Sequence, residues 1–188
     1  MPEAHLEHSA GQHPAGQHAV EQYRRWFRYE QDSHAKCLAS LHGVPEPLRL
    51  ASGFQKAVDL TAHLIAARRL WLLRFGVASD GPRSLSELFP RQALLGDLSP
   101  ALKRMEAAWE PWLQQLTAAE LARVFEYSGV GSDQRYRSSV EDVLTQLFGH
   151  SWYHRGQIAL LLRSIGAEPA VTDFVFWSRE VLPAGGEA

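Results

Sequence analysis

Two histidines stand four residues apart near the start of a largely apolar stretch, FGHSWYHRGQIALLLRSIG, which covers residues 148–166. Residues at positions i and i+4 of an α-helix lie on one face, with their Cβ atoms about 5–6 Å apart. His150 and His154 also continue a stripe of apolar residues at helical spacing, so we expect both imidazoles to face the core. Two imidazoles in this arrangement can bind the same metal ion.

A third histidine, His63, occupies a similar position on another predicted helix, where its neighbours Leu60 and Leu64 are apolar. Three neutral imidazoles would form an open site that leaves a fourth position for water or substrate. Glu30 and His34 fall on the inner side of the first predicted helix and could approach the same cavity. The sequence therefore predicts a mononuclear, histidine-rich metal site.

Two common classes of metalloprotein lack their signature in this chain. Zinc proteases with an H-E-x-x-H motif need a glutamate after the first histidine, and that position is Ser151 here. Di-iron bundle proteins carry Glu-x-x-His on two helices, but no glutamate stands three residues before His63, His150 or His154. Imidazole suits zinc, nickel, copper and iron, so the ligand types do not select the metal.

Other side chains near the histidines have both a chemical and a structural interpretation. Arg155 and Tyr153 are candidates for catalysis: Arg155 could bind an anionic substrate or form a structural ion pair, and Tyr153 could donate a proton, although it points off the histidine stripe. Cys37 could act as a substrate-side thiol, but its place on an apolar helix face favours burial. The histidines could instead pair with carboxylates such as Asp59, without any metal.

Amphipathic helices must position these residues. The spacing of apolar residues predicts four of them, at 20–41, 53–75, 99–116 and 139–165. A short helix is expected at residues 84–88, and a small hairpin or an irregular loop at 121–137. Four long helices joined by connections of varied length favour an all-α fold, a four-helix bundle.

The length and composition indicate one ordinary globular domain. The chain has 188 residues, and we expect a disordered tail at 1–17 before a domain at 18–188 that ends in an extended segment. A net charge of −2 argues against a general nucleic-acid binder. The single cysteine, the lack of a signal-peptide pattern and the lack of an apolar run of about 20 residues favour a cytoplasmic protein without membrane contact.

The histidine segment at 148–166 resembles the C-terminal signature of the DinB/YfiT-like superfamily, in which a histidine, three residues and a second histidine lead into Arg-Gly-Gln. The stretch AHLIAARRLWLLRFG resembles the second helix of the family, whose first metal histidine falls on His63. YRRW at 23–26 is similar to the opening of its first helix, and VTDFVFW from Val171 resembles its closing segment. The resemblance covers residues 20–177.

This resemblance implies a four-helix bundle of DinB type, often a dimer, in which His63, His150 and His154 hold one divalent metal ion, commonly zinc or nickel. The superfamily includes S-transferases and isomerases that use low-molecular-weight thiols such as bacillithiol or mycothiol. We therefore expect a metal-dependent thiol S-transferase or hydrolase with a small-molecule substrate. The alternative is a non-catalytic metal-binding protein that serves a stress response through a partner. An enzyme should have an open coordination site and a pocket on which polar groups converge. A binding protein should have a metal that is closed off, or an apolar surface for its partner.

Overall fold

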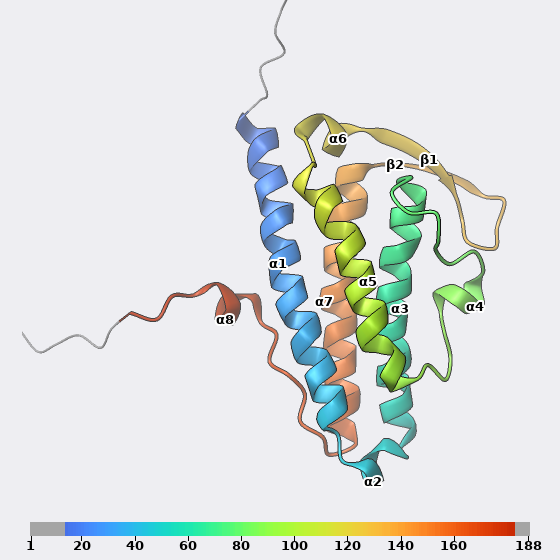
Figure 1. Cartoon of the computed structure of the whole chain (residues 1–188), viewed down its shortest axis with the longest axis vertical. Coiled ribbons are helices and arrows are strands. Elements are labelled where there is room, and N and C mark those ends of the chain that lie inside the picture. The colour runs from blue at the N-terminus through green and yellow to red at the C-terminus, as the bar shows by residue number, and fades with distance from the viewer. Residues whose placement is uncertain (1–13, 183–188) are drawn as a thin grey trace, which may run out of the picture.

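Four long helices make up most of the protein (Figure 1). The computed structural model describes residues 14–182, and the long helices are α1 (Pro14–Gly43), α3 (Ser52–Arg74), α5 (Leu95–Gln114) and α7 (Val140–Ser164). They lie side by side, and α3 packs against both α5 and α7. The protein is therefore predominantly helical, as the sequence predicts. No helix in this described part of the chain has the length and apolar character of a membrane span.

The predicted helix boundaries are close to the observed ones for α3 and α7 but not for the other two. Helix α1 begins at Pro14, so residues 14–17, which we expected in the tail, belong to a helix. The rest of that tail, residues 1–13, lies outside the described residues. Helix α5 begins at Leu95 rather than at Ser99, so its first turn precedes the predicted start.

Short elements connect the long helices. They are α2 (Glu46–Arg49), α4 (Leu85–Leu88), α6 (Ala118–Ala122), the strands β1 (Val124–Ser128) and β2 (Arg135–Ser139), and α8 (Phe174–Ser178). The predictions of a short helix before α5 and of a hairpin before α7 are confirmed. The short helix α8 interrupts the C-terminal segment, which we expected to be extended throughout. In Figure 1 the hairpin and α4 lie on the same side of the molecule, beside α3.

The antiparallel hairpin leads directly into α7. Its register pairs Val124 with Ser139, the last residue of β2. Ser139 also caps α7, because its Oγ accepts a hydrogen bond from the backbone N–H of Asp142 at 3.0 Å. Gly131 in the connecting turn has a φ of +68°, a conformation that glycine adopts without the steric cost of a side chain. The hairpin is thus held close to the N-terminal end of α7.

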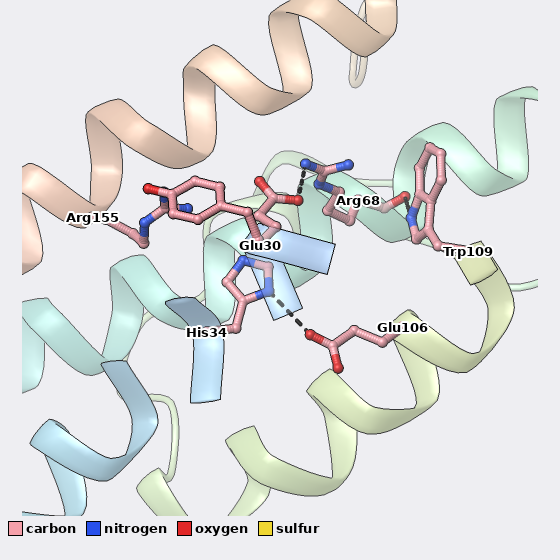
Figure 2. Close-up of polar contacts among 7 residues, drawn as sticks. Glu30, His34, Arg68, Glu106, Trp109 and Arg155 are labelled. Atoms are coloured by element: carbon pink, nitrogen blue, oxygen red, sulfur yellow. Dashed lines mark hydrogen bonds and ion pairs between the residues drawn. The ribbon is translucent and has the colours of Figure 1, made fainter. Parts of the chain in front are cut away.

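The core contains a buried ion pair among apolar side chains (Figure 2). Glu30 of α1 and Arg68 of α3 have side chains that are 0% and 2% exposed, and Arg68 donates a hydrogen bond to the Glu30 carboxylate. The guanidinium carbon of Arg68 lies 5.4 Å from the ring centroid of Trp109 in α5 and 4.7 Å from that of Phe148 in α7. One guanidinium therefore contacts side chains from the three other long helices.

Replacing Glu30 with alanine is expected to lower the free energy of unfolding by about 3–5 kcal/mol, because the buried charge of Arg68 would lose its partner. Glu21→Ala is the matched control on the same helix, since Glu21 pairs with Arg24 near the surface, where such pairs contribute about 0–1 kcal/mol. Urea denaturation followed by circular dichroism measures both values. Equal losses in the two variants would show that the buried pair does not stabilise the fold.

Candidate metal centre

The packing of α3 against α7 brings three imidazoles together. His63 comes from α3, and His150 and His154 come from consecutive turns of α7. The Nε2 atom of His150 lies 3.2 Å from Nε2 of His63 and 3.0 Å from Nε2 of His154. One nitrogen from each ring lies within 4.8 Å of the other two, so the three histidines are close enough to bind one metal ion.

Hydrogen bonds to the other ring nitrogens determine the tautomers of two of these histidines. The carbonyl oxygen of Leu88 lies 2.7 Å from Nδ1 of His63, so this nitrogen carries the proton and donates it. The side-chain oxygen of Gln157 accepts from Nδ1 of His154 in the same way at 2.6 Å. In the neutral rings, Nε2 of both histidines therefore carries a lone pair and no proton.

Hydrogen bonding alone does not satisfy the lone pairs that meet at the centre of this cluster. Nε2 of His150 is within hydrogen-bond distance of both other Nε2 atoms, yet it carries at most one proton. At least one lone pair therefore faces a nitrogen that offers it no donor, at a cost of about 1–3 kcal/mol. A cation between the rings would interact with all three, and imidazole is a common ligand of divalent transition metals. The donor set thus fits a metal ion.

Burial keeps the imidazoles of His63 and His150 in the uncharged form that binds metal ions. The pKa of His150 is lowered to about 4, first by burial and then by the neighbouring His154, His63 and Arg68. The pKa of His63 is also lowered, mainly by burial. Both rings are therefore neutral at pH 7, the state that a histidine ligand requires.

The connection between α3 and α5 holds His63 in its orientation. The imidazole stacks on the ring of Phe89, with centroids 4.5 Å apart and planes 13° apart. Ser84 and Glu87 form a capping box that starts α4 and positions Leu88, whose carbonyl oxygen accepts the hydrogen bond of His63. A hydrogen-bonding partner on the second nitrogen is usual for histidines that bind metals.

A cavity of about 460 Å³ opens onto the three imidazoles. Residues of α3, α4, the hairpin and α7 line it, most of them are apolar, and no aspartate or glutamate is among them. Binding sites for small molecules have volumes of roughly 300–1,000 Å³ and mostly apolar walls. The arrangement therefore gives a small ligand access to the histidines.

Comparison with protein-family models matches residues 16–181 to the model described as the DinB family. The chain belongs to the DinB family. This match confirms the resemblance that the two spaced histidines and the following Arg-Gly-Gln indicate. Searches of curated proteins and of solved structures found no match.

Three polar residues singled out in the sequence of this DinB-family protein have partners outside the cavity. Glu30 pairs with Arg68, and Nδ1 of His34 lies 3.1 Å from a carboxylate oxygen of Glu106 (Figure 2). Glu30 and His34 could have approached the cavity from the inner side of α1, but neither residue lines it. Asp59 accepts hydrogen bonds from its own helix and from the following loop, so it does not serve as a histidine partner.

The two candidates for catalysis, Arg155 and Tyr153, also lie outside the residues that line this cavity. Arg155 is buried and donates a hydrogen bond to the Tyr29 hydroxyl at 2.8 Å, while its Nε and Nη1 atoms have no hydrogen-bond partner among the described residues. Tyr153 is 64% exposed and packs edge-on against His154, with ring centroids 5.2 Å apart. The structure therefore places both residues on the histidine helix α7 but outside the lining of this cavity.

Sequence reasoning missed the groups that orient the imidazoles. The spacing of His154 and Gln157 carried a signal, because residues three apart share a helix face. The Leu88 carbonyl carried none, since every residue has a backbone acceptor and only the folded loop shows which one reaches His63. Phe89 was equally hidden, because it lies just after a four-residue helix without a long apolar period.

Cys37 is expected to react slowly with Ellman's reagent in the folded protein. The side chain is buried, and burial raises the pKa of the thiol, so the reactive thiolate is scarce. At pH 8 the native chain should react about tenfold or more slowly than the chain unfolded in urea. The unfolded chain provides the control, because it should release one equivalent for its single cysteine. Equal rates would contradict burial and make Cys37 a candidate nucleophile again.

Proposed function

We propose that this protein binds one divalent metal ion between His63, His150 and His154 and acts as a metal-dependent enzyme on a small molecule. The inward-facing lone pairs support the metal site. The cavity carries the proposal of an enzyme, because it leads from the surface to the nitrogen atoms, whereas a structural metal is closed off by protein ligands. It favours an enzyme over a non-catalytic metal-binding protein that acts through a partner.

Zinc or nickel is the ion that we propose, because imidazole suits both and family resemblance points to them. A divalent ion supplies Lewis acidity, which lowers the pKa of a water molecule or a thiol. Thiol S-transfer and hydrolysis both need such a deprotonated nucleophile, and they are the two reactions that we propose. The substrate class is a small molecule, with a low-molecular-weight thiol as the second reactant in the transfer reaction.

The chain's own residues would orient the histidine ligands. Leu88 and Gln157 hold the rings of His63 and His154 so that Nε2 points into the cavity. Cys37 is buried outside the cavity, so we assign the reactive thiol to a substrate. Arg155 and Tyr153 lie off the cavity, and we propose no part in the chemistry for them.

We also propose that the four long helices form a four-helix bundle of the DinB/YfiT type. Their side-by-side packing and the family match support this arrangement. The homodimer and the cytoplasmic location stay predictions from the family resemblance and from the composition.

Elemental mass spectrometry on the purified chain is expected to find about one zinc or nickel ion per protein, held by three imidazoles. His154→Ala should lose this ion because one of the three ligands is removed. His42→Ala is the matched control, since His42 is exposed and lies outside the cluster. A chain without residues 1–13 should keep the metal, which separates the site from the histidines in that segment. No metal after incubation with zinc and with nickel would refute the site.

Gln157 should strengthen metal binding through its hydrogen bond to His154. We expect Gln157→Leu to weaken zinc affinity about 10- to 100-fold, because the imidazole would lose the acceptor that fixes its tautomer. Gln157→Glu is the matched variant, since it keeps an oxygen acceptor at the same place and should retain the affinity. Competition with a chromogenic chelator measures both constants. Equal weakening in the two variants would show that the hydrogen bond does not support the ligand.

A further inference from the structure

The histidine cavity is elongated along α3. His63 and Arg74 both line it, and they are eleven residues apart on that helix. At 1.5 Å per residue their Cα atoms are separated by about 16 Å along the axis, and three full turns place them on the same face. Ala67, Leu70 and Trp71 lie between them and line the cavity with apolar surface. The cavity therefore has the three imidazoles at one end and a guanidinium at the other.

The hairpin holds the guanidinium of Arg74 in a defined position. Its carbon atom lies 4.5 Å from the ring centroid of Trp71 and 4.6 Å from that of Tyr127 in β1. Its Nη2 donates a hydrogen bond to the backbone carbonyl oxygen of Ser128 at 2.6 Å. Arg74 is the last residue of α3. Figure 1 shows the hairpin beside this C-terminal end of the helix. Two aromatic rings and one hydrogen bond thus fix a planar cation at the edge of the cavity.

Arg74 has no carboxylate partner among the described residues, and this distinguishes it from several other arginines. Arg68 pairs with Glu30, Arg69 with Asp80 and Arg123 with Glu120, but no ion pair includes Arg74. The cavity lining contains no acidic residue that could neutralise it. Arg74 is half-buried, so its charge is partly desolvated, and an anion in the cavity would offset that cost. The donors that Ser128 does not use remain available for such an anion.

We propose that Arg74 is a specificity-determining residue that binds the anionic end of an elongated ligand. The ligand's apolar body lies along Ala67, Leu70 and Trp71, and its other end reaches the three histidines. The proposal rests on the function proposed above and narrows its substrate class to amphiphilic anions. A carboxylate, sulfonate or phosphate matches the planar fork of a guanidinium, which can donate two parallel hydrogen bonds. The volume of about 460 Å³ limits the ligand to a small molecule.

Isothermal titration calorimetry with octanoate, 1-octanol and octylammonium tests this assignment, because the three probes share a tail and differ in charge. The full chain is measured twice, loaded with zinc and stripped with a chelator. We expect the stripped protein to bind octanoate about tenfold or more tightly than either other probe. One charge-assisted hydrogen bond contributes enough binding free energy for such a difference. Arg74→Met should abolish this preference, and Arg74→Lys should keep part of it through its charge.

Arg69→Met is the matched control, because Arg69 stands on the same helix, pairs with Asp80 and does not line the cavity. It should bind the probes as the unchanged chain does. Circular dichroism checks that each variant is folded. If Arg74→Met does not fold, Arg74→Lys becomes the test variant. Octanoate should then bind Arg74→Lys at least about threefold more weakly than it binds the unchanged chain.

Three outcomes would overturn the role of Arg74. In the first, Arg74→Met retains the preference for octanoate. In the second, the preference for octanoate is lost on chelation and in His154→Ala. In the third, none of the probes binds. The second would place the acid group at the histidines and leave the metal site standing. Conversely, a preference that depends on Arg74 in the stripped protein would stand even if the chain proved to hold no metal, so the two proposals fail separately.

Discussion

The buried charge of Arg68 is the constraint on which the arrangement of the helices depends. A guanidinium in the core is tolerated only where a counter-ion and other polarisable groups surround it, and here Glu30, Trp109 and Phe148 do so from three different helices. This requirement sets the rotation of each long helix about its own axis. Because Phe148 precedes His150 by two residues, the same contact fixes the direction in which the histidines of α7 project.

Both long helices and the groups around them determine how the histidine rings are arranged. The helices determine the backbone position of each histidine. The loop after α3 and the side chain of Gln157 determine which ring nitrogen of His63 and His154 faces inward. Both are needed, because an imidazole with the wrong tautomer would present a proton to a cation. Burial acts in the same direction by holding His63 and His150 in the neutral form. Geometry, hydrogen bonding and electrostatics therefore all favour metal binding by the cluster.

Much of this was accessible from the sequence, because helical periodicity is a local signal. The spacing of His150 and His154, the inward position of His63 and the existence of the hairpin follow from patterns within about twenty residues. The partners of residues that meet across helices do not follow from such local patterns. Glu30 was visibly inward-facing, yet its partner Arg68 stands beside Arg69 in a pair that looks like solvated surface. The partner choices of Glu30 and His34 depend on how helices pack, which no local pattern encodes.

Two kinds of structural element form the cavity. The histidines stand on long helices whose register the core enforces, while α4 and the β1–β2 hairpin supply much of the outer wall. Gly129 and Val130 of the connecting turn line the cavity, and residues 131–134 of the same turn are exposed. Insertions or exchanges in this turn would reshape the entrance without disturbing the ligand nitrogens. The scaffold is thus suited to diversification, since the shape of the cavity can change while the histidine cluster stays intact.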